Sequence, residues 1–177
     1  FLNISSNKTV PVLVKKDGEV KEESLDIIMW ALSESKIQNL KKLYITNNKE
    51  NEIFELITEN DYKFKYHLDR FKYSARFNPI HEDYHFSNAN RFINKWNKIL
   101  AKSRWLFGDN PSIADWCIWP FVRQFKIACE SQKKTNFFEP PIKEWLDYFE
   151  KHQNFEKIMH KYDVWKPSSK KDFFPCN

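Results

Sequence analysis

The first pattern along the chain is a short β-branched run, a turn signal and a second short segment. VPVLV at 10–14 ends at the turn residues KKDG, and EVKEE at 19–23 is a second short run. This arrangement predicts a β-hairpin. After Ser24 apolar residues recur every three to four positions, which predicts a helix. Ser24 stands just before the first of them and is its predicted N-cap. These residues are Leu25, Ile28, Met29 and Leu32.

Residues 34–50 are polar and show no sustained period, which predicts a linker between two units. Residues 1–33 would then form a small unit that contains strands, and residues 51–177 a helical domain. The chain contains only two glycines, which argues against glycine-rich phosphate loops and hairpin-rich sheets. The predicted fold class is therefore α+β and mostly helical.

The helical domain shows its clearest stripe after residue 85. Its apolar members are Phe86, Ala89, Phe92, Ile93, Trp96, Ile99 and Leu100, with polar residues between them. Before it, residues 61–77 predict a helix that ends ahead of Asn78-Pro79. After it, Ser112 and Asp115 form a capping box in front of a segment that is apolar nearly all round, which predicts a central helix with Pro120 inside it.

HEDYH at 81–85 has the H-E-x-x-H spacing of zinc peptidases, in which two histidines bind the metal and the glutamate acts as general base. Such a site needs a third protein ligand. Residues 86–108 contain no Asp, Glu or His, and His81 lies just after Pro79, at the predicted start of a helix where acids stabilise the dipole. We therefore predict that HEDYH binds no metal and forms the first turn of a helix.

Composition narrows the class of protein. Aromatic residues make up 17% of the 177 residues, which is typical of a globular chain, and no apolar run approaches the length of a membrane span. The formal charge is +5, but basic and acidic residues are interspersed, so neither a nucleic-acid nor a membrane partner is expected. The three cysteines lack the spacing of a disulfide framework, which indicates free thiols and a cytoplasmic location.

Three short motifs occur in a definite order along the chain. Val10-Pro11 opens a strand, Glu23-Ser24 precedes a helix, and S-I-A-D at 112–115 begins the central helix. Together with KYHLDRFKY and the closing FEKIMHKYDVWKP, they make the chain resemble the bacterial, omega-like branch of the glutathione S-transferase family over nearly its whole length. The resemblance implies the C-terminal half of a thioredoxin-like domain followed by an all-α domain, with the first strand, helix and strand lying ahead of Phe1.

The resemblance also implies a function. It identifies the chain as similar to enzymes that bind glutathione as co-substrate and conjugate its thiolate to an electrophile, with the catalytic residue expected upstream of Phe1. It places glutathione beside Val10, Pro11, Glu23 and Ser24, with Lys8 as a partner for a carboxylate. A helix N-terminus favours an anion independently of any family. Alternatives are a glutathione-dependent thiol-disulfide oxidoreductase and a non-catalytic binding protein on the same scaffold.

The same resemblance implies a second substrate, small and hydrophobic or a disulfide, in a pocket of the helical domain. Its predicted wall is one face of the helix over residues 61–77, formed by Tyr62, Tyr66, Arg70 and Tyr73. Members of the family are usually homodimers, so a homodimer is expected for the full-length protein.

Overall fold

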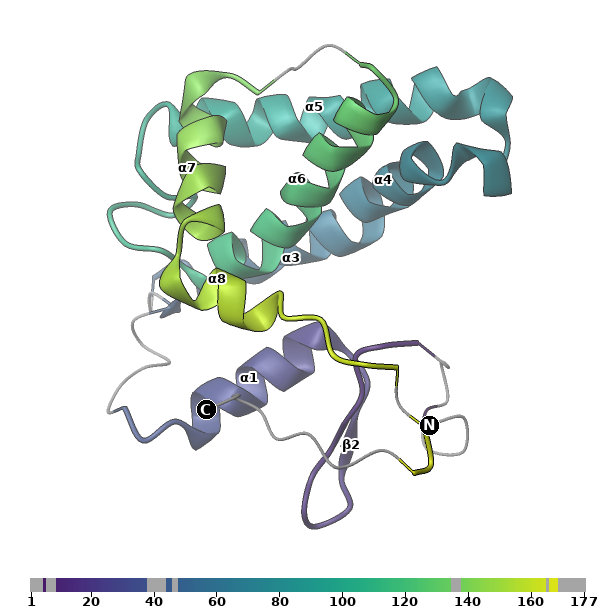
Figure 1. Cartoon of the computed structure of the whole chain (residues 1–177). Coiled ribbons are helices and arrows are strands. Elements are labelled where there is room, and N and C mark those ends of the chain that lie inside the picture. Colours follow the sequence, from purple (N-terminus) through teal and green to yellow (C-terminus); the bar gives the residue numbers. More distant parts are fainter. Residues whose placement is uncertain are drawn as a thin grey trace.

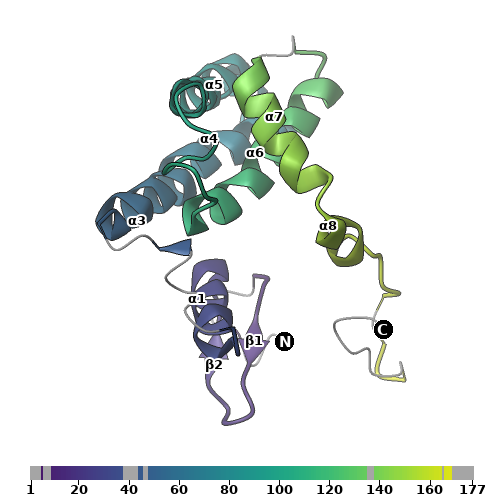
Figure 2. The ribbon, with the colours of Figure 1, turned by 90° about the vertical axis from the view of Figure 1, so that its left-hand side faces the viewer.

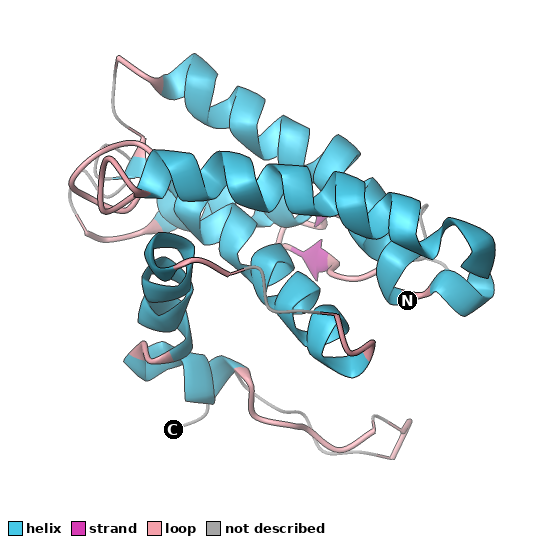
Figure 3. Ribbon diagram, turned by 90° about the horizontal axis from the view of Figure 1, so that it is seen from above, coloured by secondary structure: helices cyan, strands magenta, loops and turns pink. Residues whose placement is uncertain are grey.

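Helices dominate the chain (Figure 3) and lie mostly in one part above a smaller part (Figure 1). The computed structural model describes residues 5, 9–37, 44–45, 48–134, 138–164 and 166–168. Within these residues the only sheet is a pair of strands. The predicted α+β, mostly helical fold class is confirmed.

The smaller part consists of a hairpin and one helix. Its elements are β1 (Leu13–Val14), β2 (Val20–Lys21) and α1 (Ser24–Glu34). The strands pair antiparallel with Leu13 opposite Lys21 and Val14 opposite Val20. In Figures 1 and 2, α1 lies beneath the helical part.

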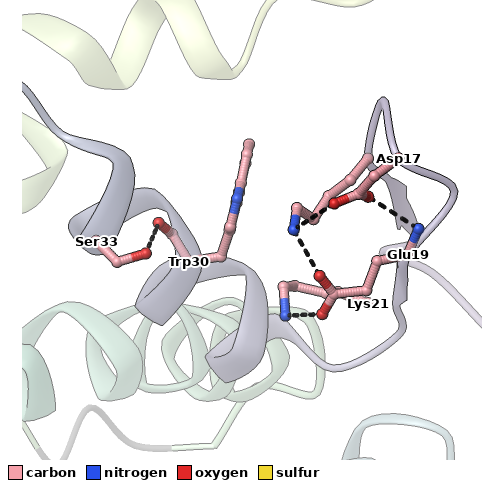
Figure 4. A network of polar contacts seen from close by, with 6 residues as sticks. Asp17, Glu19, Lys21, Trp30 and Ser33 are labelled. Atoms are coloured by element: carbon pink, nitrogen blue, oxygen red, sulfur yellow. Dashed lines mark hydrogen bonds and ion pairs between the residues drawn. The ribbon is translucent and has the colours of Figure 1, made fainter.

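The turn between the strands explains why KKDG ends the first run. Gly18 has a φ of +89°, a conformation that residues with a side chain rarely adopt. Its N–H donates to the Lys15 carbonyl at 3.0 Å, and the Lys15 N–H donates to the Glu19 carbonyl at 2.8 Å. The Glu19 carboxylate also pairs with the ammonium groups of Lys15 at 2.6 Å and Lys21 at 2.7 Å (Figure 4). The turn is thus fixed by backbone geometry and charge together.

The start of α1 differs by one residue from the prediction. Ser24 is the first helical residue, and the N-cap is Glu23, whose backbone is extended and whose side chain makes no capping hydrogen bond. Ser24 is therefore not the N-cap that its residue type predicts. The predicted apolar residues Leu25, Ile28, Met29 and Leu32 do pack against the core, each of them partly buried.

The helical part contains the remaining elements. In chain order they are α3 (Glu50–Glu59), η1 (Asn60–Phe64), α4 (Lys65–Lys72), η2 (Ser74–Arg76), η3 (Pro79–His81), α5 (Glu82–Leu100), α6 (Ile113–Ser131), α7 (Pro140–Glu150) and α8 (Gln153–Ile158). None of the helices in the described ranges is both long and apolar enough to cross a membrane.

Helix α6 is the central helix that its sequence predicts. Ser112 and Asp115 form the predicted capping box at its start. Nine of its residues are buried: Ile113, Ala114, Asp115, Ile118, Trp119, Val122, Phe125, Ala128 and Cys129. They form a broad face of the helix, against which α3, α4 and α7 pack. Figure 1 shows α4 and α7 on either side of α6.

Helix α5 packs along α4 through the predicted stripe. Ala89, Ile93, Trp96 and Leu100 are buried, and Phe86, Phe92 and Ile99 pack beside them. A polar residue, Asn97, is buried with them. Its Oδ1 accepts the N–H of Ile142 at 3.1 Å, and its Nδ2 donates to Glu139. The side chain of Asn97 therefore holds the start of α7 against α5.

The segment predicted as one helix over residues 61–77 is divided in the structure. Residues 60–64 form a π-helix between α3 and α4, and α4 ends at Lys72 before the 3₁₀ turn η2. A π-turn accommodates one extra residue without ending the helix. The side chain of Asn78 then accepts the N–H of Ile80 at 3.1 Å, which caps the short turn that begins at Pro79.

Candidate functional site

The open end of the hairpin brings two of the sequence motifs together. Extending the β1–β2 register by two residues from Leu13 and Lys21 places Pro11 opposite Glu23. The Val10–Pro11 peptide bond is cis, and the Val10 side chain is 80% exposed. Pro11, Glu23 and Ser24 are exposed as well. The hairpin therefore presents the Val-Pro and Glu-Ser pairs to solvent at one edge.

The N-terminus of α1 lies at this edge and carries the positive end of the helix dipole. The Ile27 N–H donates to the Glu23 carbonyl at 3.1 Å, which starts the helical ladder, whereas the Glu23 side chain caps none of the first-turn N–H groups. Uncapped N–H groups at a helix start favour an anion such as a carboxylate. The acidic side chain of Asp26 lies in the same turn and opposes part of this effect. Lys8 lies outside the described residues.

The four residues predicted to form a substrate wall are only partly contiguous. Tyr66 and Arg70 stack on each other, with the guanidinium carbon 3.6 Å from the ring centre. Tyr73 stands one turn further along, beside the side chains of Lys72 and Arg76. Tyr62 is 78% exposed and lines a cavity of about 480 Å³ on α3, of which the other three are not part. Their role as one wall stays a prediction.

The two described cysteines, Cys117 and Cys129, are free thiols. Burial raises the pKa of the Cys117 thiol to about 12, and the carboxylate of Asp61 adds to the shift. Burial also raises the pKa of the Cys129 thiol to about 12. A thiolate is the nucleophilic form of cysteine, so neither side chain is a nucleophile at neutral pH. Both belong to the packing of α6.

The acids of HEDYH are engaged with side chains of the protein. Glu82 and Asp83 form the first turn of α5, as predicted, and both pair with Lys134. Glu82 also accepts the hydroxyl of Ser74 at 2.7 Å. His81 lies just before the helix, in η3. No group of three or more metal-ligating side chains is found in the described part of the chain.

The second histidine of HEDYH has a partner that the sequence does not reveal. Nδ1 of His85 lies 2.9 Å from Nδ1 of His67 on α4, so one ring donates and the other accepts. The rings of Tyr66 and Tyr84 contact both histidines. The pKa of each imidazole is lowered, chiefly by burial, and the nearby Arg70 adds to the effect. This pair was missed because its members are 18 residues apart on different helices, so no local spacing marks them.

Asp115 has a structural role, as its motif predicts. It is fully buried and accepts four hydrogen bonds. Their donors are the Leu106 N–H at 3.0 Å, the Ser112 N–H at 2.8 Å, the Ser112 hydroxyl at 2.6 Å and the Trp145 indole N–H at 2.9 Å. One carboxylate therefore connects the loop before α6 to α6 and α7.

Solved structures with the same fold include enzymes and a domain of a translation factor. A glutathione S-transferase from Rhodospirillum rubrum F11 is 20% identical, with a TM-score of 0.70 over 92% of this chain and 75% of that one. A glutathione S-transferase of Vibrio parahaemolyticus is 18% identical, with a TM-score of 0.66 over 87% and 74%. The glutathione S-transferase-like domain of elongation factor 1-gamma from Saccharomyces cerevisiae is 13% identical, with a TM-score of 0.70 over 91% and 77%. At these identities the likeness shows the fold alone.

A family model matches the helical part. No curated protein sequence matches the chain. Residues 65–151, from the start of α4 to the end of α7, match the family model described as glutathione S-transferase, C-terminal domain. The match includes the capping box of α6 and the buried Asp115. The helical part therefore contains a glutathione S-transferase C-terminal domain.

Proposed function

We propose that this protein binds glutathione at the open end of the hairpin and, as a glutathione transferase, conjugates the thiolate to an electrophile. The observation that supports the proposal is the β1–β2 register, since extending it by two residues brings Pro11 opposite Glu23 at the start of α1. A ligand carboxylate would meet the uncapped N–H groups and the Ser24 hydroxyl. The Glu23 carboxylate would pair with the ligand's ammonium group.

The remainder of the proposal follows the family. Lys8 would pair with a second carboxylate, and Tyr62, Tyr66, Arg70 and Tyr73 would contact the hydrophobic or disulfide substrate. Residues 1–33 would form the glutathione-binding unit, 34–50 the linker and 51–177 the helical domain, in a cytoplasmic homodimer. The catalytic residue is unassigned, and membership in the omega-like branch stays a prediction.

Two alternatives share the scaffold. A glutathione-dependent thiol-disulfide oxidoreductase needs a cysteine thiolate. Burial raises the pKa of the Cys117 and Cys129 thiols to about 12, so this cysteine, like the catalytic residue of a transferase, is expected upstream of Phe1. A non-catalytic binding protein is favoured by one observation, which is that an elongation-factor domain has this fold. Fold alone does not imply a reaction.

Loss of the Ser24 hydroxyl tests the glutathione site. We expect Ser24→Ala to weaken the affinity for glutathione by about tenfold or more, because one hydrogen bond to a charged group contributes about 1.5–3 kcal/mol in proteins. Less of the full-chain protein should then be retained on immobilised glutathione. The matched control is Ser33→Ala on the same helix, whose exposed hydroxyl donates to the Trp30 carbonyl at 2.7 Å (Figure 4). Equal retention of wild type, Ser24→Ala and Ser33→Ala would count against the assigned site.

Two activity assays then separate the three functions. Conjugation of glutathione to 1-chloro-2,4-dinitrobenzene supports the transferase. Glutathione-dependent reduction of a small disulfide without conjugation supports the oxidoreductase. Retention on glutathione with neither activity supports the binding protein.

A further inference from the structure

A cavity lies on the helical part, between α5 and α7. Its volume is about 450 Å³, and three stretches of chain line it. These are the end of α5, residues 104–105 after it, and the first half of α7. Figure 1 shows the end of α5 and the start of α7 together at the upper left, with α1 and the hairpin at the bottom. Sites for small molecules usually have volumes of about 300–1,000 Å³.

Two oppositely charged side chains line this cavity. Arg104 and Glu144 are both exposed, and neither forms an ion pair or a side-chain hydrogen bond with another described residue. The Arg104 guanidinium carbon lies 5.6 Å from the ring centre of Trp105. A guanidinium stacked on a ring keeps its N–H groups free to donate at its edges. The cavity therefore offers charged donors from the loop after α5 and a carboxylate from α7.

The phenol of Tyr148 is a third polar group in the lining. Tyr148 lies one turn after Glu144 on the same face of α7, because residues four apart are neighbours on a helix. Its hydroxyl makes no hydrogen bond to another described residue. Its ring meets that of Trp105 edge to face, with centres 4.7 Å apart. These rings and Pro140 give the cavity apolar surface beside its charged groups.

The two sides of the cavity are connected through Asp115. Its buried carboxylate accepts the N–H of Leu106, which follows Trp105, and the indole N–H of Trp145, which follows Glu144. The loop and α7 are therefore fixed to one another before any ligand arrives. Such preorganisation lowers the cost of binding.

A ligand that matches this lining carries both charges. A molecule with one charge would pair with Arg104 or Glu144 alone, whereas a zwitterion pairs with both. The neighbouring rings favour a flat apolar side chain. We propose that this cavity binds a free α-amino acid with an aromatic side chain, with its carboxylate at Arg104 and its ammonium group at Glu144.

This site is separate from the proposed glutathione site. The glutathione site involves the hairpin and the start of α1, and no residue of these elements lines the cavity. The proposal therefore goes beyond the proposed function and holds whether or not glutathione binds.

Three ligands of similar shape test the pairing of charges. Phenylalanine carries both charges, 3-phenylpropionate lacks the ammonium group, and phenethylamine lacks the carboxylate. Their affinities for the full chain would be measured by equilibrium dialysis at pH 7.5. We expect phenylalanine to bind the wild type about 2- to 5-fold more tightly than either of the others, as for one partly exposed ion pair.

Two charge variants assign the ends of the ligand. Arg104→Gln should weaken phenylalanine and 3-phenylpropionate by about 2- to 5-fold and should not weaken phenethylamine. Glu144→Gln should weaken phenylalanine and phenethylamine to the same extent and should not weaken 3-phenylpropionate. Lys102→Gln and Glu156→Gln are the controls, since they change exposed charges outside the cavity.

A third variant locates the bound molecule. Ala101→Trp adds a large ring to the cavity wall and should abolish binding of phenylalanine. If it does not fold by circular dichroism, Ala101→Leu takes its place. Ser24→Ala should leave the binding of phenylalanine unchanged, and Arg104→Gln should leave retention on immobilised glutathione unchanged. These last two measurements separate the cavity from the glutathione site.

Three results would overturn the proposal. Failure of phenylalanine to bind the wild type would remove the site. An equal effect of each charge variant on all three ligands would remove the pairing of charges. Unchanged binding to a folded Ala101 variant, or loss of binding in Ser24→Ala, would place the ligand elsewhere.

Discussion

Asp115 is a carboxylate with four donors in an environment that disfavours its charge. Burial raises its pKa, while the hydrogen bonds from Leu106, Ser112 and Trp145 act in the opposite direction. The donors come from a loop, a helix start and a neighbouring helix. Removing the carboxylate would therefore affect more than the cap of α6. At the scale of one residue, the capping-box motif identified the right side chain, and the structure adds two donors from outside the motif.

Removal of this carboxylate should destabilise the protein by more than an ordinary cap loss. We expect Asp115→Ala to lower the free energy of unfolding by about 3 kcal/mol, because it leaves several buried donors unpaired, at about 1–3 kcal/mol each. Relief from burying a charge offsets only part of this loss. Urea denaturation followed by circular dichroism measures the difference. Asp147→Ala is the control, since its partly exposed pair with Lys151 is worth less than about 1 kcal/mol. A loss of about 1 kcal/mol or less in Asp115→Ala would show that the other donors find water.

The pairing of α4 with α5 shows what element-level patterns predict. The stripe from Ala89 to Leu100 placed α5 against the core correctly, because apolar burial follows the 3.6-residue period. The π-helix at residues 60–64 was not predicted, because one inserted residue leaves the surrounding apolar spacing nearly intact. The contact of His67 with His85 depends on how two helices lie side by side, and a single sequence without that arrangement contains no local mark of it.

This histidine pair should make the stability of the helical part depend on pH. Because the pKa of each imidazole is lowered in the folded state, the unfolded chain binds more protons once the pH falls below about 6.5. The free energy of unfolding should therefore fall as the pH is lowered from 7.5 to 5.5, and two protonated rings cannot keep the 2.9 Å contact. Replacing both residues, His67→Gln with His85→Gln, should reduce this fall, as measured by urea midpoints at the two pH values.

The control for this effect is His160→Gln, which changes an exposed histidine and should leave the pH dependence as in the wild type. If the double variant and the wild type lose the same stability over this range, the pair does not titrate with unfolding.

In the whole molecule, α1 connects the proposed glutathione site with the helical part. Its N-terminus stands at the edge where Pro11 and Glu23 are exposed, and its later turns reach a cavity of about 300 Å³ at the start of α6. The sequence predicts the glutathione site through motifs that lie close together along the chain, and that site stays a prediction. The cavity required Ile113 and Trp116, about 80 residues further on, to meet Ile28 and Leu32. A sequence pattern identifies such residues as apolar but does not show where their packing leaves space.

Glutathione should stabilise the whole chain if the proposed site is correct. Ligand at ten times its dissociation constant adds about 1.4 kcal/mol to the free energy of unfolding, which corresponds to a rise in Tm of roughly 3–5 °C for a chain of this size. Helix content, followed by circular dichroism, and tryptophan fluorescence should shift together if α1 and the helical part unfold as one unit. Ser24→Ala should reduce the shift and Ser33→Ala should not. A Tm that does not respond to glutathione at any concentration would contradict the proposed site, whereas a shift seen by one method alone would show that the two parts unfold separately.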